Sequence, residues 1–382
     1  MNDRIDVIVP AHRAHKTLER TLESLAVQSI AGDLDVTVID DECPEGDYCD
    51  AAEPFASRLN IRLIRLPHNL GPGGARQAGI DATDDPYFTC IDADDSFTGP
   101  SSLELLRNVM DEDDTIQRCG GGIVFRDCSG EKIRQGRGGV SMDGKLFRRS
   151  FIDRYDLRFN GTRANEDYGY NLAVDLLCDS DDERTYTIPE AVVDVHENPH
   201  SITGAADRNF AWDQRLCGFA DNSIWAVDFA KRYRPDSGEV DRNILRALLI
   251  IYSYLCVIAA KAPMYTDQAF EYAKKYYHQC YRRWYIPAFA SMEKNLKPET
   301  TKMIFETFAK QKFFPLPEDF EPFLGFDEFL KIMRTEEYDP DHIYDVWAKM
   351  AESPEMKALM DMNEVTGVCS RGYRERGREE NV

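Results

Sequence analysis

Segments typical of buried strands and of helices alternate along residues 1–203 of this chain. The strand segments are short apolar runs, and the helical segments carry apolar residues at helical spacing. We expect strands over Ile5–Pro10, Asp35–Ile39, Ile61–Leu66 and Tyr87–Ile91. We expect helices over Thr17–Ile30, Arg76–Ala82 and Leu103–Met110. This alternation predicts an α/β fold with a mostly parallel sheet and helices on both faces.

Polar side chains follow three of these strands, in Pro10-Ala11-His12, Asp40-Asp41 and Asp92-Ala93-Asp94. Ligands of open α/β sheets bind at the carboxyl ends of strands, so these segments predict a binding site. Two carboxylates beside a buried strand are expensive unless their charge is compensated. They can share a hard divalent cation, which prefers oxygen ligands. The alternative is an acidic turn that caps the following helix.

The composition excludes several classes of function. The 382 residues suffice for two domains, and 46 basic and 68 acidic residues give a net charge of −22. This charge disfavours nonspecific binding to nucleic acid or to an anionic membrane. A bound metal could still attract an anionic substrate. The longest apolar run, Ala247–Ala260, is shorter than the roughly 20 residues of a bilayer span, so we expect no transmembrane segment.

Ten cysteines occur without a Cys-x-x-Cys pair or a regular spacing. This pattern disfavours a zinc site and a disulfide framework, and it favours a reducing compartment. The first residues lack the pattern of a signal peptide. We therefore expect a cytoplasmic protein.

Strand signals almost vanish after about residue 205, and long helical segments follow at Asn209–Tyr233, Arg242–Lys261 and Thr266–Tyr285. We expect a first domain over residues 1–204, a helical domain over residues 205–370 and a frayed tail at residues 371–382. Residues 205–208 are the expected linker. The segment Thr266–Tyr285 is rich in aromatic residues, which suit helix packing, a homodimer interface or an acceptor platform.

Five motifs occur in a fixed order: Ile5–Pro10, Val38–Asp41, Asn69–Arg76, Asp92–Asp95 and Glu166-Asp167. Together they resemble the family 2 glycosyltransferases, which have a GT-A fold and a DXD motif. The segment Gly144–Phe151 is similar to the branch of that family that acts on bacterial cell-surface polysaccharides. The resemblance implies a nucleotide diphosphate sugar donor, such as a UDP-sugar, and a glycan or lipid-linked acceptor. It also implies Mn²⁺ or Mg²⁺ as cofactor, and it leaves open peripheral attachment at the inner face of the membrane.

The resemblance also implies roles for individual residues at the donor site. The residues expected to bind the nucleotide sugar are Pro10, Ala11, His12, Asp40, Asp41, Gly73, Arg76, Asp92 and Lys145. Asp40 and Asp41 would receive the nucleobase and ribose, and Asp92 would touch the ribose. The usual Gly-Ser after the paired aspartates is replaced by Glu42-Cys43, and His12 replaces the usual aromatic residue.

Each of these assignments has an alternative from local structure. Asp40 and Asp41 could cap a turn. Arg76 could brace the site through Asp92 without touching the nucleotide. Lys145, with Arg148 or Arg149, could meet phosphate or could be exposed basic residues.

The metal and the catalytic base are also assigned by the resemblance. Asp94 would bind the metal, and His196 would complete its shell or close over the diphosphate, although a lone histidine is often structural. Glu166 would touch the acceptor, and Asp167 would act as the general base. A sugar hydroxyl is a poor nucleophile at neutral pH, so it needs such a base. The alternative for these two acids is a helix N-terminus that favours negative charge.

The sequence therefore predicts a metal-dependent transferase that attacks from the face opposite the nucleotide and so inverts the anomeric centre. A nucleotide-sugar-binding module without catalysis is one alternative, and Asp92 and Asp94 together with Asp167 argue against it. A sugar-1-phosphate nucleotidyltransferase is the other. That class carries a glycine-rich, lysine-bearing segment directly after the first strand, which residues 10–13 lack.

Overall fold

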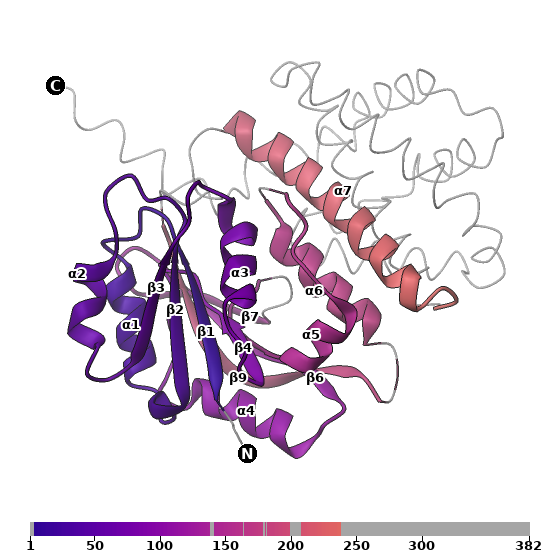
Figure 1. Cartoon of the computed structure of the whole chain (residues 1–382), viewed down its shortest axis with the longest axis horizontal. Coiled ribbons are helices and arrows are strands. Elements are labelled where there is room, and N and C mark those ends of the chain that lie inside the picture. Colours follow the sequence, from indigo (N-terminus) through magenta and orange to yellow (C-terminus); the bar gives the residue numbers. More distant parts are fainter. Residues whose placement is uncertain are drawn as a thin grey trace, which may run out of the picture. The chain divides into compact units, whose positions relative to one another are not determined.

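The computed structural model describes residues 4–137, 141–162, 164–178, 180, 182–198 and 208–237 (Figure 1). These residues belong to one compact unit, Met1–Val240. The helices predicted over Arg242–Lys261 and Thr266–Tyr285 lie outside the described residues, as does the predicted tail.

The described strands form one mixed sheet in the order β3-β2-β1-β4-β8-β6-β9-β5, with β7 paired to β6. Strands β1 to β4 run parallel to their neighbours in that group, and β6 runs parallel to β9. The other pairings are antiparallel. The strands are β1 (Ile5–Ala11), β2 (Leu34–Asp40), β3 (Asn60–Arg65), β4 (Tyr87–Cys90), β5 (Ser96–Phe97), β6 (Ile116–Arg126), β7 (Lys132–Arg137), β8 (Lys145–Arg148) and β9 (Arg184–His196).

Helices cover both faces of the sheet. Helices α1 and α2 lie on one side of β1 to β3, and α3 lies on the other (Figure 1). The helices are α1 (Leu18–Ala26), α2 (Cys49–Ala52), α3 (Gly71–Asp81), α4 (Ser102–Glu112), α5 (Arg149–Tyr155), α6 (Glu166–Leu177) and α7 (Arg208–Tyr233), with 3₁₀ turns at Ala31–Asp33 and Glu53–Phe55. This architecture confirms the predicted α/β class.

Strand β1 is buried on both faces, which explains its continuous apolar sequence. Val7 and Val9 belong to the core that includes Leu22 of α1. Ile8 points to the other face and meets α3 at Gly79. A Cβ atom on Gly79 would lie 2.4 Å from Ile8 Cγ2, so only glycine allows the helix to approach the strand this closely.

Helix α7 is bonded to the segment that precedes and begins α6. The Asn222 side-chain amide donates to Thr162 Oγ1 at 2.8 Å and to the Ala164 carbonyl at 3.3 Å. The Ser223 and Tyr168 hydroxyls lie 3.3 Å apart. Residues 205–207 of the expected linker lie outside the described residues, and position 208 is the first of α7. The boundary predicted between residues 204 and 205 stays a prediction.

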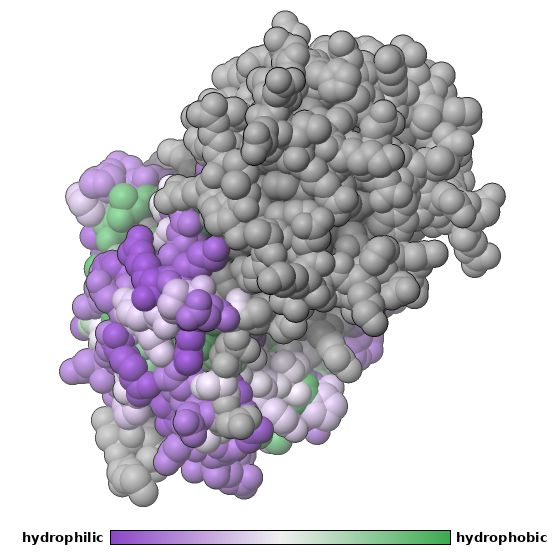
Figure 2. All heavy atoms as spheres, turned by 90° about the vertical axis from the view of Figure 1, so that its right-hand side faces the viewer, coloured by the Kyte–Doolittle hydropathy of each residue, from purple (hydrophilic) through white to green (hydrophobic). Residues whose placement is uncertain are grey.

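One face of the described residues is largely polar. Hydrophilic side chains cover most of the coloured face in Figure 2, and hydrophobic ones form small separate areas. No helix within the described ranges is both long enough and apolar enough to cross a membrane.

Candidate active site

The strand-end motifs meet at one edge of the sheet because β1, β2 and β4 are parallel. Ala11 at the end of β1 pairs with Asp40 at the end of β2, and the Asp41 N–H donates to the Ala11 carbonyl at 2.9 Å. The Ile91 N–H donates to the Ile8 carbonyl at 3.1 Å, which brings the segment after β4 alongside β1. The resulting edge carries all three polar segments.

Asp40 is buried and uses only one of its carboxylate oxygens for a hydrogen bond. Oδ1 accepts from the Cys43 N–H at 2.7 Å, so this oxygen closes the turn after β2. Oδ2 has no hydrogen bond among the described residues and lies 3.4 Å from Arg65 Nη1. Asp40 therefore caps a turn and also retains a buried acceptor.

Asp41 is tied to the start of α3. Its two carboxylate oxygens accept from the Leu70 and Gly71 N–H groups at 2.7 and 2.9 Å. Burial raises the pKa of Asp41, and these backbone donors oppose that rise. Asp41 is thus bonded to the N-terminus of α3, and not to the turn after β2 that the alternative from local structure assigned to it. Its contact with the nucleotide stays a prediction.

His12 is exposed beside this turn. Its Nδ1 lies 2.9 Å from the Asp41 carbonyl oxygen and 3.2 Å from Asn69 Nδ2. Pro10 is half-buried and Ala11 is buried, so these two residues contribute mainly backbone to the edge.

Arg76 links two parts of the site that lie far apart in sequence. It is buried, with Nη2 donating to Asp92 Oδ1 at 2.5 Å and Nη1 donating to Glu166 Oε1 at 2.7 Å. Burial by itself lowers the pKa of Arg76, but the two carboxylates raise it well above its ordinary value. Arg76 therefore braces the acidic site, and a direct contact with the nucleotide stays a prediction.

Gly73 makes room for this arrangement. A Cβ atom at position 73 would lie 2.7 Å from Glu166 Cγ. The glycine-rich start of α3 therefore positions a carboxylate, in addition to any role in meeting the nucleotide.

Asp92, Asp95 and Asp143 form an acidic cluster after β4. Each offers a carboxylate oxygen, and these oxygens lie within 4.8 Å of one another. The Asp92 N–H donates to Asp143 Oδ1 at 2.9 Å. Burial and the charge of Asp92 raise the pKa of Asp143 to about 7. Three carboxylates held this close repel one another, and the oxygen donor set fits a hard divalent cation.

The two predicted metal ligands lie beside this cluster. Asp94 Oδ2 accepts from the Asn198 side-chain amide at 2.7 Å. The pairing of β5 with β9 brings the His196 N–H to Asp95 Oδ1 at 2.9 Å, while His196 Nε2 lies 2.9 Å from Ser96 Oγ. The backbone of His196, rather than its ring, thus touches the cluster, and both ligand assignments stay predictions.

The three basic residues considered as phosphate contacts, Lys145, Arg148 and Arg149, lie in different parts of the structure. Lys145 is buried in β8, where its ammonium group bonds to the Ser141 carbonyl and burial lowers its pKa to about 7. Arg148 lies opposite Tyr87, the first residue of β4, in the pairing of β8 with β4. Arg149 forms an ion pair with Asp6, the second residue of β1. The two arginines therefore lie at the sheet edge opposite the aspartates, which excludes them as phosphate contacts there.

Glu166 and Asp167 begin helix α6. Glu166 is paired with Arg76, whereas no cation of the described residues forms an ion pair with Asp167. Asp167 Oδ1 accepts from the Tyr168 N–H at 2.7 Å. Burial and the charge of Glu166 raise the pKa of Asp167 to about 6. Asp167 thus has the protonation behaviour that suits a general base near neutral pH.

The model of the family described as Glycosyl transferase family 2 matches residues 6–167. This range contains every acidic residue of the site described above and ends at Asp167, whereas His196 lies beyond it. Over these residues the chain therefore matches the family 2 glycosyltransferases, as its motifs predicted.

Two of the proteins with a similar sequence come from rhizobia. A succinoglycan biosynthesis protein, ExoU of Rhizobium meliloti, is 28% identical over 193 residues, which are 42% of this chain and 54% of the relative. An N-acetylglucosaminyltransferase of Mesorhizobium japonicum is 27% identical over 216 residues, 49% of this chain and 50% of the relative. The chain thus spans about half the length of these relatives.

A solved structure of a mannosyltransferase from Pyrobaculum calidifontis, in complex with GDP-Man and Mn²⁺, aligns with a TM-score of 0.48 and 15% identity. The alignment covers 80% of this chain and 86% of the mannosyltransferase.

Proposed function

We propose that this protein is a metal-dependent, inverting glycosyltransferase. It moves a sugar from a nucleotide diphosphate sugar, first of all a UDP-sugar, to an acceptor hydroxyl in polysaccharide synthesis. The observation that carries this proposal is the bridge from Asp92 through Arg76 to Glu166. It joins the proposed donor side of the site to the proposed acceptor side, with Asp167 next to it.

The donor would lie along the ends of β1, β2 and β4. Asp40 Oδ2, which has no hydrogen bond among the described residues, would accept from a nucleobase ring N–H, and His12 would stack on the base. Asp92 contacts the ribose. Lys145 is buried and bonded to backbone, so its part in phosphate binding requires that its ammonium group turn from the Ser141 carbonyl.

A divalent cation, Mn²⁺ or Mg²⁺, would be held by Asp94 together with carboxylates of the Asp92, Asp95 and Asp143 cluster. When bound, it would supply positive charge for the leaving nucleotide diphosphate. The backbone N–H of His196 keeps one oxygen of Asp95 in position.

Asp167 would take the proton from the acceptor hydroxyl. Its pKa of about 6 leaves it ionised at neutral pH, yet makes it a stronger proton acceptor than an ordinary aspartate. Glu166, fixed by Arg76, orients the acceptor. Attack from the side opposite the diphosphate inverts the anomeric centre.

The proposed acceptor is a glycan or a lipid-linked glycan, and the proposed location is the cytoplasm. The names of the relatives in succinoglycan biosynthesis and N-acetylglucosaminyl transfer favour a polysaccharide product. Such an acceptor would be reached at the inner face of the membrane.

The proposal is tested by incubating the full chain with labelled UDP-, GDP- and dTDP-sugars, with Mn²⁺ and a panel of oligosaccharide acceptors. A transferase releases the nucleoside diphosphate as the label moves to acceptor. Release of pyrophosphate from sugar 1-phosphate and nucleoside triphosphate would instead show a nucleotidyltransferase. Tight binding of a nucleotide sugar without turnover would show a binding module.

A further inference from the structure

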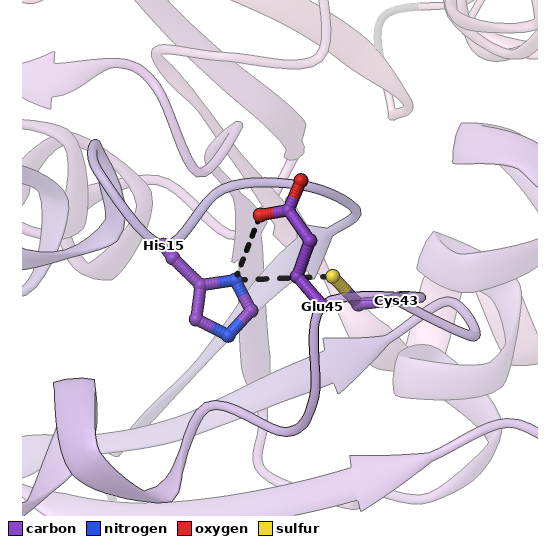
Figure 3. Close-up of side chains that lie close together, drawn as sticks. All are labelled: His15, Cys43 and Glu45. Carbon is purple, nitrogen blue, oxygen red and sulfur yellow. Dashed lines mark hydrogen bonds and ion pairs between the residues drawn. The ribbon is translucent and has the colours of Figure 1, made fainter.

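An imidazole, a thiol and a carboxylate come together beside the end of β2. Figure 3 shows these side chains, with dashed lines from one nitrogen of the His15 ring to the Cys43 sulfur and to the Glu45 carboxylate. His15 Nδ1 lies 3.8 Å from Cys43 Sγ and 3.7 Å from Glu45 Oε2. The three potential ligand atoms lie within 4.8 Å of one another. None of these residues has a role in the proposed transfer reaction.

A backbone contact determines which nitrogen of His15 faces the other two side chains as an acceptor. Nε2 lies 2.9 Å from the Asp47 carbonyl oxygen. A carbonyl only accepts, so Nε2 carries the hydrogen and Nδ1 of the neutral ring carries the lone pair. Histidine ligands of metals are held in this way, with the second nitrogen donating to a carbonyl or carboxylate.

Aromatic packing supports the same geometry. The rings of His15 and Tyr48 stack with their centroids 4.5 Å apart, which fixes the plane of the imidazole. The Tyr48 hydroxyl accepts from the Ala14 N–H at 3.1 Å and is hydrogen-bonded to the Cys43 side chain. A hydroxyl hydrogen directed at sulfur stabilises a thiolate.

The spacing of the ligand atoms is close to that of a tetrahedral zinc site. Zn–S bonds of about 2.3 Å and Zn–N and Zn–O bonds of about 2.0–2.2 Å place ligand atoms about 3.4–3.6 Å apart. The two separations from His15 Nδ1 exceed this range by a few tenths of an ångström. The Glu45 side chain is 58% exposed, so it can move to close the difference.

The charges also match a divalent ion. Cys43 is fully buried, and a buried thiolate without a cation is expensive. One thiolate and one carboxylate neutralise a charge of +2, and the neutral imidazole adds none. In the absence of a metal, the same residues form an ordinary buried thiol beside a histidine.

We propose that His15, Cys43 and Glu45 bind a divalent transition-metal ion of the zinc class, with the fourth position open to water. The thiolate distinguishes this site from the all-oxygen cluster of aspartates, which suits Mg²⁺ or Mn²⁺. The ion fastens the segment after β1 to the loop after β2. That loop begins at Asp40, which accepts from the Cys43 N–H, so the ion also steadies the turn next to the edge of the sheet.

The test uses the full chain, stripped of metal and titrated with Co²⁺, which replaces Zn²⁺ and reports its ligands by absorption. We expect a thiolate-to-cobalt charge-transfer band that saturates at one equivalent and disappears when Zn²⁺ is added. Binding of Co²⁺ to the aspartate cluster contributes no such band, because the ligand atoms that the cluster offers are carboxylate oxygens. The readout is therefore independent of glycosyl transfer.

Two variants and a control assign the band. Cys43→Ser should abolish it, and His15→Gln should weaken Co²⁺ affinity by at least about tenfold, since even supporting residues of metal sites contribute 10–100-fold. Cys49→Ser, which removes an exposed thiol at the start of α2, should leave the titration unchanged. Thermal melting confirms that each variant is folded, and His15→Gln carries the test if Cys43→Ser unfolds. The absence of a band in the wild type, or unchanged affinity in a folded ligand variant, would overturn the proposal.

Discussion

Gly73 and Glu166 lie in the first turns of two different helices and touch. A Cβ atom built on Gly73 would come within 2.7 Å of Glu166 Cγ, a separation that real Cβ atoms essentially never show. Glu166 in turn accepts from Arg76, and Arg76 also holds Asp92. The lack of a side chain at position 73 is therefore a condition for the bridge between the two sides of the site.

Gly73→Ala should reduce transfer without unfolding the protein. The added methyl group pushes Glu166 away from Arg76, and we expect a loss in kcat/KM of roughly tenfold or more, because small misplacements at a site are costly. The measurement is steady-state kinetics of transfer together with thermal melting. Gly32→Ala is the control, since a Cβ atom there has no neighbour within 4 Å. Equal kinetics for the two variants would contradict the role given to Gly73.

Arg76→Met should destabilise the fold as well as the site. It leaves Glu166 buried without its cation, and loss of one partner of a buried pair costs several kcal/mol. We expect the free energy of unfolding to fall by on the order of 3 kcal/mol. The loss is not larger because Asp92 is partly exposed and water screens its charge. Denaturant unfolding measures this loss. Arg58→Met removes an exposed ion pair with Glu23 and should leave the unfolding midpoint nearly unchanged.

Strands β1, β2 and β4 were predictable because their apolar runs are largely buried on both faces. Strand β3 has only half-buried and exposed residues, and it was predictable from Ile61, Leu63 and Ile64. Each predicted end of β1, β2, β3 and β4 lies within one residue of the structure. The first helix was predicted too long, to Ile30, because apolar spacing continues past its last hydrogen-bonded turn. Val27 is 49% exposed, and Ile30 precedes a separate 3₁₀ turn.

The site was predictable where a motif marks a strand end or the first turns of a helix. Asp40, Asp41, Asp92 and Asp94 lie at the edge that the parallel order of the strands implies. Asp143 was missed because a single acid in a glycine-rich segment has no local pattern. The antiparallel return of β8 beside β4 brings it to the cluster. The close packing of Gly73 against Glu166 could not be predicted for the same reason, because it is a tertiary contact without a local sequence pattern.

Asp167→Asn should lower the rate of transfer by roughly 10²–10⁴-fold with donor affinity nearly unchanged, because it removes the proposed proton acceptor alone. The pKa of Asp167 in the folded chain is about 6, above its ordinary value of 3.8, so its charge is unfavourable in the folded state at neutral pH. The stability tied to its protonated form is lost as pH rises through about 6. The uncharged asparagine should therefore keep or raise the melting temperature at pH 8.

The same group should shape the pH profile of the wild type. A base works when ionised, so kcat/KM should rise with pH up to about 6 and fall about tenfold per unit below it. Kinetics from pH 5 to pH 8 measure this limb, and we expect Asp167→Asn to lack it. An unchanged acidic limb in the variant would move the base to another group, with Glu166 as the next candidate.

Metal removal should abolish transfer. We expect excess chelator to stop turnover, Mn²⁺ or Mg²⁺ to restore it, and both Asp94→Asn and Asp143→Asn to remove the metal-dependent part of nucleotide affinity. Calorimetric titration of UDP with and without Mn²⁺ measures this difference. Asp114→Asn is the control, because its side chain is 97% exposed and its ion pair with Arg148 lies at the opposite edge of the sheet. Full activity in excess chelator would exclude the metal mechanism.

Truncation should separate the contribution of α7 from that of the residues that follow it. A fragment ending at residue 203 lacks α7 and so loses the bonds from Asn222 to the segment before α6. It also loses the bond from the Arg234 guanidinium to the Leu177 carbonyl at 3.0 Å, at the other end of α6. A fragment ending at residue 237 keeps both.

We expect the longer fragment to be soluble and to melt cooperatively, and the shorter one to be insoluble or to melt at a much lower temperature. Helix α6 begins with Glu166 and Asp167, so loss of its packing partner should also reduce any hydrolysis of donor by the shorter fragment. Circular dichroism and donor hydrolysis measured on both fragments test this. Asn222→Ala in the longer fragment is the matched variant, because this one buried amide bonds to both Thr162 and Ala164. If the fragment ending at residue 203 were as stable and as active as the longer one, α7 would not be needed to hold α6 and its two acids in place.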